Sequence, residues 1–539
     1  MLTDESSHGR GTAGLGWFHW LLGSWQRRWG VLLLFTVVTR LPLLTYPKAC
    51  DDEQVYTVVA IEMLHGGLPY ADAVERKPPL LFYLYAGMLR VFGERNYLAL
   101  HVGALMWTLA TMALLAVTMR RLFDAGTGWA AALLYALFTA WANYTNLAFN
   151  GELLMNLPIV AALAIVFGIS SSKRRPELIA AGALVAIGFL LKQPAAIAGL
   201  PLGVYLLAGP YRRGRALGRV SALGQVAMLG LGFAGTLAMA ALYLGHVGIL
   251  AEAWYWTIGN HANPLGPTTW FFWHKLPARG ALFLAETLPL WMLVTLSLRE
   301  GLGAGTMWKS RQAEFVALGV LLVVSAFGVT VNGQFNYHYF LALAPALAML
   351  AAPALAEIWR GSRAIRLRCL RPVFLARWLA LTALLFLVVD TIGLAQNRGP
   401  LAVAAYVRAH STAEDRIFMW GQGTAQTGIY LDADRRPATR YIASFPLNGL
   451  IFGLFDEHYD TRDRIVPGAW DNLRRDFARH PPRFIIDCHE MRNGRLHKIR
   501  DQPYLKALLA ANFREVYRDA DGIVYERQSG ESLGTARRE

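Results

Sequence analysis

The chain has 539 residues, of which 55% are hydrophobic and 17% are charged, and its mean hydropathy is +0.33. These values exclude a string of ordinary soluble domains and are typical of a polytopic membrane protein with one modest soluble part. The formal net charge is +15. Because the basic residues fall in short clusters between apolar spans and form no continuous stripe, nucleic-acid binding is not predicted.

Apolar stretches of membrane length recur along most of the chain and predict about eleven transmembrane helices. The predicted spans are 29–46, 97–119, 127–144, 152–170, 177–191, 194–209, 222–245, 276–297, 313–331, 338–357 and 375–397. One further stretch, Pro79–Gly93, is short for a crossing and contains Arg90. If it does not cross, the basic clusters between the spans fall on the cytoplasmic side, as the positive-inside rule requires. We therefore predict that it lies flat on the outer face of the membrane, with the N-terminus inside and the C-terminus outside.

The predicted fold class is mainly α, a polytopic membrane protein with a small C-terminal extracytoplasmic α/β domain. Residues 1–28 are predicted to be a cytoplasmic segment. Residues 29–397 would form the transmembrane domain, with residues 47–96 as its first outer loop, and residues 398–539 the α/β domain.

Within the last domain, Arg416–Trp420 and Arg483–Cys488 have the pattern of buried strands, and Tyr504–Asn512 that of a helix. Asp519–Gly522 is a hairpin turn signal. Gly421-Gln422-Gly423 is followed by neither Lys-Ser/Thr nor a third glycine, so we interpret it as a strand-end turn and not a nucleotide loop. The three cysteines, Cys50, Cys369 and Cys488, have no metal-binding spacing, and a Cys50–Cys488 disulfide is left open.

Three carboxylates, Asp51, Asp52 and Glu53, follow the first span where the chain leaves the bilayer. They begin a predicted helix, and acids at a helix N-terminus are favourable without any further function. The functional alternative is a general base whose pKa is raised toward neutrality by neighbouring charge and partial burial. We favour Asp52 over Asp51 as this base, because Asp51 is nearer the membrane exit. Glu53 would hydrogen-bond an acceptor or orient Asp52.

A paired Arg76-Lys77 lies in the same loop, directly before Pro78-Pro79. A residue before proline is restricted to an extended conformation, which would aim the Lys77 ammonium reproducibly at a phosphate. The alternative is a lysine that reaches toward anionic headgroups at the interface. Lys192 separates two apolar runs at the same outer level and is a second candidate cation.

Further polar residues are predicted at this outer level. Glu152 begins an apolar span, where an ionisable group is either functional or a helix-dipole partner. Arg40 lies in the outer third of the first span and needs an anionic partner, for which Glu152 is the predicted one. His338 and Tyr339 open the next-to-last span, and they would donate to a phosphate or belong to an interfacial aromatic belt.

Together these residues resemble the membrane glycosyltransferases of the GT-C fold, in particular the branch that holds protein O-mannosyltransferases and bacterial lipid A aminoarabinose transferases. The motifs are Asp52-Glu53-x-x-Tyr56, the run from Met63 to Tyr70 with Asp72, Lys77-Pro78-Pro79-Leu80, Glu152, Lys192 and His338-Tyr339-Phe340 with Pro345. The resemblance covers about Arg40 to Ala351. Two positions depart from this pattern. Val55 stands where the aminoarabinose transferases have an arginine, and Arg76 stands where many relatives have an acidic residue.

The resemblance implies an inverting transfer of a sugar from a polyprenyl phosphate on the outer face of the bacterial inner membrane. Asp52 would be the base, with Glu53 beside it. The donor phosphate would be bound by Lys77, with Arg76, Lys192, His338 and Tyr339 as further candidates, and Asp51, Tyr56, Glu152 and Arg40 would support the site or bind the acceptor. The acceptor is a glycan, a lipid or a protein, and the two departures argue against copying the lipid A assignment.

The carrier phosphate is the leaving group in such a transfer, so no nucleotide pocket is required. No cofactor is predicted, and a divalent metal is left open. One rival function is a flippase or transporter for lipid-linked sugars, which should carry polar residues deep within many spans. The other is a polysaccharide polymerase of the same fold class, which would use a lipid-linked oligosaccharide.

Overall fold

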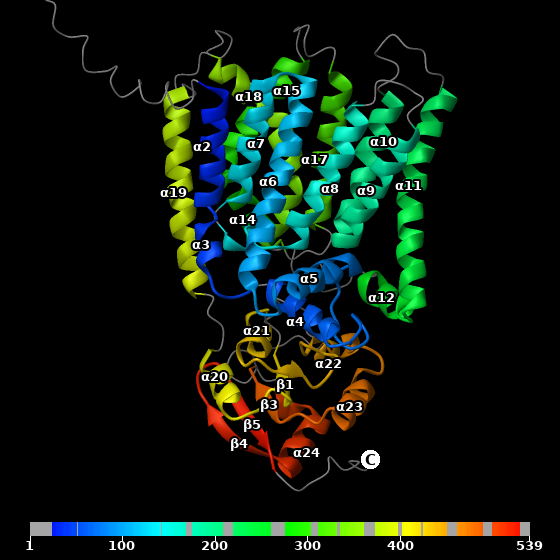
Figure 1. Cartoon of the computed structure of the whole chain (residues 1–539), viewed down its shortest axis with the longest axis vertical. Helices are drawn as coiled ribbons and strands as arrows, with labels where there is room; N and C mark the ends of the chain where they lie inside the picture. The colour runs from blue at the N-terminus through cyan, green and yellow to red at the C-terminus, as the bar shows by residue number, and fades with distance from the viewer. Residues whose placement is uncertain are drawn as a thin grey trace, which may run out of the picture.

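The computed structural model describes residues 24–50, 52–141, 143–168, 175–208, 219–259, 275–302, 311–330, 335–360, 372–396, 401–421, 424–449, 461–488 and 498–528. A bundle of roughly parallel helices forms one part of the molecule and a small α/β domain forms the other (Figure 1). Helices α4 (Asp52–Leu64) and α5 (Pro79–Phe92) lie between the two parts. In Figure 1, α5 runs across the direction of the bundle, and its place on the outer face of the membrane stays a prediction.

The helical part consists of long helices joined by short helical segments. Its elements are α2 (Trp25–Val38), α3 (Leu41–Thr45), α6 (Tyr97–Leu122), α7 (Ala125–Thr139), η1 (Tyr144–Asn146), α8 (Gly151–Gly168), α9 (Arg175–Leu191), η2 (Gln193–Ala198), α10 (Gly199–Ala208), α11 (Arg219–His246), α12 (Leu250–Thr257), α14 (Lys275–Glu286), α15 (Leu288–Leu302), α17 (Gln312–Thr330), η5 (Tyr337–Leu343), α18 (Ala344–Trp359) and α19 (Pro372–Gln396). Among the described residues, 5 helices are long and apolar enough to cross a membrane, or up to 7 if two bent helix pairs each count as one span. The total of eleven spans stays a prediction.

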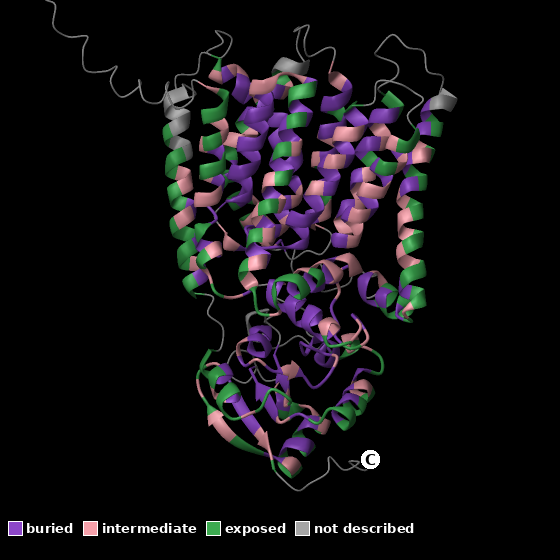
Figure 2. Ribbon diagram, in the orientation of Figure 1, coloured by how far each residue is buried: buried purple, intermediate pink, exposed green. Residues whose placement is uncertain are grey.

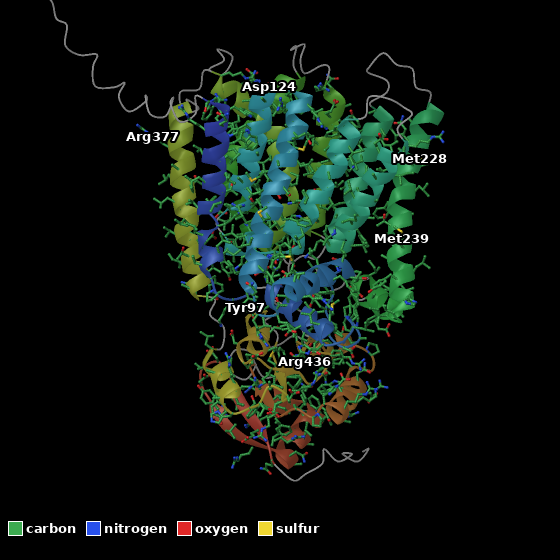
Figure 3. The ribbon with its side chains drawn as sticks, viewed as in Figure 1. Tyr97, Asp124, Met228, Met239, Arg377 and Arg436 are labelled. Carbon is green, nitrogen blue, oxygen red and sulfur yellow. The ribbon has the colours of Figure 1, made fainter. Side chains whose placement is uncertain are left out.

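Burial separates the central helices from those at the rim. Purple, buried residues fill the middle of the bundle, whereas α11 and α19 are largely pink and green (Figure 2). The exposed side chains on these two helices include large apolar ones, such as Met239 on α11 and Leu381 on α19, which are 65% and 67% exposed. Figure 3 shows Met239 on the outer rim. Apolar side chains that face outward from a helix bundle are suited to contact with lipid.

Helices α9 and α11 pack closely because glycines lie at their crossing. A Cβ on Gly182 would be 1.9 Å from the Leu229 carbonyl oxygen, and a Cβ on Gly232 would be 1.9 Å from that of Ile179. Small residues at helix crossings allow backbones to approach in this way, which is common between transmembrane helices.

The α/β domain is built on a five-stranded sheet of order β2-β1-β3-β5-β4. Strand β1 pairs in parallel with β2 and β3, whereas β5 pairs antiparallel with β3 and β4. The elements are α20 (Leu401–Ala409), β1 (Arg416–Trp420), α21 (Thr424–Asp432), β2 (Arg436–Pro437), α22 (Phe445–Asn448), η7 (Arg462–Arg464), α23 (Ala469–Arg479), β3 (Phe484–Asp487), η9 (Ile499–Asp501), α24 (Pro503–Asn512), β4 (Phe513–Arg518) and β5 (Ile523–Arg527).

The predicted strands, helix and hairpin turn of this domain are confirmed, whereas Gln422 and Gly423 of the predicted strand-end turn lie outside the described residues. β1 and β3 are almost entirely buried, and α24 begins one residue before the predicted helix. Asp519 closes the predicted turn, because its Oδ1 accepts hydrogen bonds from the backbone N–H groups of Asp521 (2.7 Å) and Gly522 (3.0 Å). The Cys50–Cys488 disulfide is not formed, and both cysteines are buried.

The α/β domain rests directly on α4. Glu62 of α4 accepts two hydrogen bonds from Arg436, at 2.7 and 2.6 Å, and lies 3.6 Å from Arg416. Figure 3 shows Arg436 at the junction of the two parts. Gly428 of α21 lies against the Gln54 side chain of α4, and a Cβ on Gly428 would be 2.4 Å from Gln54 Oε1. The helix that begins at Asp52 is therefore clamped between the bundle and the α/β domain.

Candidate active site

Asp52 is the first residue of α4 and lies among cations. Its Oδ2 accepts a 2.9 Å hydrogen bond from the Tyr56 hydroxyl, one helical turn later, and lies 3.8 Å from His338 Nε2. Burial raises the pKa of Asp52, but the charges of Lys77, His338 and Lys192 and the Tyr56 hydrogen bond outweigh burial and lower the pKa to about 2. The prediction of a pKa raised toward neutrality was therefore wrong. The physical reason is that two lysines from other segments surround the carboxylate.

Lys77 is held in the loop before α5. Its Nζ lies 3.2 Å from Glu75 Oε1 and 5.6 Å from the centre of the Tyr56 ring. Its carbonyl oxygen accepts a 2.8 Å hydrogen bond from the Tyr70 hydroxyl. Burial lowers the pKa of Lys77, but the carboxylates of Glu75 and Asp52 raise it above the ordinary value, so this side chain is an ammonium ion.

Glu75 was missed by the sequence analysis. It is 4% exposed and ion-paired with Lys77, so it belongs to the cluster. The signal was its spacing, since residues i and i+2 of an extended segment point to the same side.

A second pair completes the cluster. Lys192 Nζ lies 2.6 Å from Glu152 Oε1 and 5.4 Å from the centre of the Tyr339 ring. His338 Nε2 lies 3.9 Å from Glu152 Oε1, so it stands between this carboxylate and that of Asp52. Within the described part of the chain, His338 Nε2 is buried and has no hydrogen-bond partner.

Local structure explains why the second pair forms. Gly151 opens α8, and a Cβ there would lie 3.0 Å from the Leu191 carbonyl oxygen and 3.0 Å from Lys192 Cδ. A glycine thus lets the turn after α9 approach the start of α8, which places Lys192 beside Glu152. Asn156, one turn further along α8, donates a 3.0 Å hydrogen bond to the Leu341 carbonyl oxygen and holds the η5 segment that carries His338.

The structure brings seven of the predicted residues together from segments far apart in sequence. They are Asp52, Tyr56, Lys77, Glu152, Lys192, His338 and Tyr339. Asp51 lies outside the described residues.

Glu53 points to a different set of partners. Its carboxylate accepts hydrogen bonds from the backbone N–H of Cys50 (3.0 Å) and of Phe149 (2.6 Å), and it lies 3.2 Å from His101 Nε2. Burial raises its pKa, but His101 and the two backbone donors lower it below the ordinary value. These contacts support a structural role for Glu53 in place of the predicted catalytic one.

Arg40 does not contact Glu152, and that predicted pairing was wrong. Its guanidinium donates to Thr139 Oγ1 at 2.6 Å and to Thr39 Oγ1 at 3.0 Å. Helix α7, which carries Thr139, and helix α19 occupy the positions beside Arg40. The order of helices around a bundle is a tertiary feature that the sequence pattern did not reveal.

Arg76 contacts the α/β domain. Its guanidinium carbon lies 5.1 Å from the centre of the Phe445 ring of α22, and its carbonyl oxygen accepts a hydrogen bond from Gln193. The predicted phosphate cation beside Lys77 is thus stacked on an aromatic ring. Among the described residues, no group of three or more His, Cys, Asp and Glu side chains is arranged to hold a metal ion.

Fold and site together define a membrane protein of the GT-C fold, as expected. The solved structures that share its fold include ArnT from Cupriavidus metallidurans bound to undecaprenyl phosphate, with a TM-score of 0.58 at 14% identity, over 93% of this chain and 98% of that one. They also include the archaeal oligosaccharyltransferase AglB from Archaeoglobus fulgidus, with a TM-score of 0.51 at 12% identity, over 95% of this chain and 76% of that one.

Sequence comparison indicates which glycosyltransferases of the GT-C fold the chain resembles. The family model for dolichyl-phosphate-mannose-protein mannosyltransferase matches residues 76–239. The undecaprenyl phosphate-alpha-4-amino-4-deoxy-L-arabinose arabinosyl transferase 2 of Pseudomonas fluorescens is 29% identical over an alignment of 355 residues that covers 61% of this chain and 57% of that protein. The match thus spans little more than half the length of that curated relative. The chain resembles the aminoarabinose and protein-mannosyl glycosyltransferases of the GT-C fold.

Proposed function

We propose that this protein is a glycosyltransferase that moves a sugar, with inversion, from a polyprenyl-phosphate carrier to an acceptor outside the cytoplasm. The observation that carries the proposal is the grouping of the partly buried Asp52 carboxylate with partly buried Lys77 and buried Lys192 at the end of the helix bundle. A carboxylate beside fixed cations combines a proton acceptor with a phosphate-binding site, and a transfer from a phosphate carrier needs both.

Asp52 is the base in this proposal. An acceptor hydroxyl oxygen forms a bond to the anomeric carbon and gives its proton to the Asp52 carboxylate, while the bond from that carbon to the phosphate oxygen breaks. The electron pair of the broken bond stays on the carrier phosphate. The Tyr56 hydroxyl, 2.9 Å from Asp52 Oδ2, fixes the orientation of the base.

Lys77 and Lys192 stabilise the phosphate as it leaves. The carrier phosphate gains negative charge in the transition state, and preorganised cations stabilise such charge strongly in a site with little water. The phosphate also offsets the field of the two lysines at Asp52. Donor binding therefore raises the pKa of Asp52 from its low value in the free protein and makes it a stronger base.

The donor and acceptor classes follow from the relatives and from the topology prediction. The solved ArnT structure contains undecaprenyl phosphate, which favours a bacterial polyprenyl phosphate as the carrier here. The predicted positive-inside topology puts the site and the α/β domain on the extracytoplasmic face of the inner membrane. The acceptor is a glycan, a lipid or a protein of the cell envelope.

The test has two stages. Mass spectrometry of lipids from a gene-deletion strain should show one accumulated polyprenyl-phosphate sugar, which the wild-type gene removes and an Asp52→Asn gene does not. The purified protein in neutral detergent should then transfer that labelled sugar to envelope material from the deletion strain. A flippase or transporter would fail the second stage, because detergent micelles have no two sides. An accumulated lipid-linked oligosaccharide would favour the polymerase.

A further inference from the structure

One side-chain amide joins three segments at the edge of the candidate site. Gln193 is the first residue of η2 and directly follows Lys192. Its Nε2 donates a 2.9 Å hydrogen bond to the carbonyl oxygen of Arg76 and a 3.3 Å hydrogen bond to that of Thr257, the last residue of α12. The amide thus connects the loop that carries Lys77, the turn that carries Lys192 and the end of α12.

The first of these bonds acts on the backbone of Lys77. The carbonyl of Arg76 belongs to the peptide group on the N-terminal side of Lys77, whereas the carbonyl of Lys77 is held on its other side by the Tyr70 hydroxyl. Pro78 restricts the conformation of Lys77 further. With both flanking peptide groups fixed, the direction in which the Lys77 side chain leaves the backbone is set. Gln193 holds one of these two peptide groups, through the carbonyl oxygen of Arg76.

The second lysine is fixed by the same stretch of chain. Lys192 immediately precedes Gln193, and its ammonium pairs with Glu152 at 2.6 Å. The ammonium groups of Lys192 and Lys77 repel each other. Burial and the charge of Lys77 both lower the pKa of Lys192. A neutral amide that bonds to a carbonyl oxygen can hold the two segments at a set distance without adding charge to the cluster.

We propose that Gln193 is a positioning residue for the donor phosphate, which acts by holding Lys77 at a fixed place relative to Lys192 and does not itself touch the donor. This inference rests on the proposed function, since it assumes that the two lysines bind the carrier phosphate. Its alternative is that Gln193 only stabilises the fold.

The test is binding of undecaprenyl phosphate to the purified full-length protein in neutral detergent. The variants are Gln193→Leu, Lys77→Ala and the double variant, with Gln502→Leu before α24 as a control for the same chemical change in the α/β domain. The Leu side chain keeps a similar volume but donates no hydrogen bond. We expect Gln193→Leu to raise the Kd roughly 3- to 10-fold, the range that corresponds to the net loss of a hydrogen bond. Gln502→Leu should leave the Kd unchanged.

The double variant tests whether Gln193 acts through Lys77. If it does, adding Gln193→Leu to Lys77→Ala weakens binding by less than about 2-fold, since coupled positions are not additive. If the two effects multiply, or if Gln193→Leu binds as wild type does while Lys77→Ala is weak, the positioning role is wrong. If Lys77→Ala itself binds as tightly as wild type, the phosphate site of the proposed function is wrong instead.

A second variant covers the case in which Gln193→Leu does not fold. In Gln193→Glu, a carboxylate would face two carbonyl oxygens, whereas the protonated acid would donate a hydrogen bond to one of them. The ratio of its Kd to that of wild type should therefore fall as the pH is lowered from about 8 to about 5, with acid rescue beginning near the pKa of an ordinary glutamic acid or above it. A ratio independent of pH in protein that stays folded would contradict the proposal, because a hydrogen bond from position 193 would then have no effect on donor binding.

Discussion

Asp52 and Glu53 are consecutive residues of one helix, yet their surroundings differ in kind. Glu53 lies among fixed neutral donors, namely two backbone N–H groups, with the imidazole of His101 beside it. Asp52 receives one hydrogen bond, from Tyr56, and otherwise faces the charges of lysines and an imidazole 3.8 Å away. A buried carboxylate that fixed donors satisfy holds a structure together. A carboxylate among cations, with its imidazole neighbour beyond hydrogen-bond distance, is the arrangement that the proposed transfer needs.

The largest expected effect is on turnover in Asp52→Asn. The amide keeps the shape of the side chain and removes the base, so sugar transfer should fall by about 10²–10⁴. Expression, unfolding temperature and binding of undecaprenyl phosphate should change little. Transfer assays with matched amounts of folded protein check this. If Asp52→Asn is active and Asp51→Asn is inactive, the base is Asp51.

The same chemical change one residue later should affect stability instead. In Glu53→Gln, either orientation of the amide turns its nitrogen toward a backbone N–H group, that of Phe149 or that of Cys50, so a hydrogen bond to the carboxylate is lost and a buried donor is left unsatisfied. We expect the free energy of unfolding to fall by about 3 kcal/mol. Turnover per folded molecule should stay within about 3-fold of wild type, because Glu53 does not touch the cluster. Thermal unfolding and specific activity, measured together, check both parts. A stable but inactive Glu53→Gln would restore the predicted catalytic role.

These two carboxylates also show where sequence reasoning stopped. The position of Asp52 at a helix start, the Lys77-Pro78-Pro79 segment and Glu152 at the head of a span are local patterns, and the structure brings all of them to one place. The strands and the hairpin of the α/β domain were predictable for the same reason, since short apolar runs and turn residues are local signals.

The parts that failed depend on contacts between distant segments. Two of the three partners of Glu53 are distant in sequence. His101 of α6 is 48 positions away, and Phe149, just before α8, is 96 positions away. Arg40 donates to Thr139 on α7, 99 positions further on, and no periodicity in either helix indicates that contact. The pKa shift of Asp52 was predicted in the wrong direction, because that direction depends on how many lysines from other segments lie near the carboxylate.

Lys77→Ala tests the cationic side of the Asp52 cluster. Loss of one charge-assisted contact to a phosphate should weaken donor binding by roughly 1.5–3 kcal/mol and slow turnover as well. Lys77→Arg should retain part of the binding, because the charge remains although its geometry changes. Turnover against donor concentration in neutral detergent, where bulk lipid charge is absent, separates this role from a lysine that reaches for headgroups. An unchanged donor dependence in Lys77→Ala would leave Lys192 as the phosphate cation.

The last and smallest effect concerns pH, and it follows from the same cations. Because the pKa of Asp52 is lowered to about 2 in the donor-free protein, its carboxylate stays ionised as the pH falls from neutral to about 4. The ratio kcat/KM reports groups of the free enzyme, so Asp52 should contribute no acid limb to it in that range. The value of kcat reports the donor complex, in which the phosphate offsets the lysines, so its acid limb should lie at least about one pH unit higher, equivalent to about 1.4 kcal/mol.

Lys77→Ala provides the control for this separation. Lys77 is the charge that lowers the pKa of Asp52 most, so its removal should raise that pKa and bring an acid limb into the measurable range of kcat/KM. The two profiles should then lie closer together than in wild type. The stability contribution has the matching sign: ionised Asp52 stabilises the fold above its unfolded-state pKa of about 3.9, and this contribution is lost as the pH falls toward 2. If the acid limbs of kcat and kcat/KM coincide in wild type and do not move in Lys77→Ala, the cations do not set the basicity of Asp52, and its distinction from Glu53 would then rest on geometry alone.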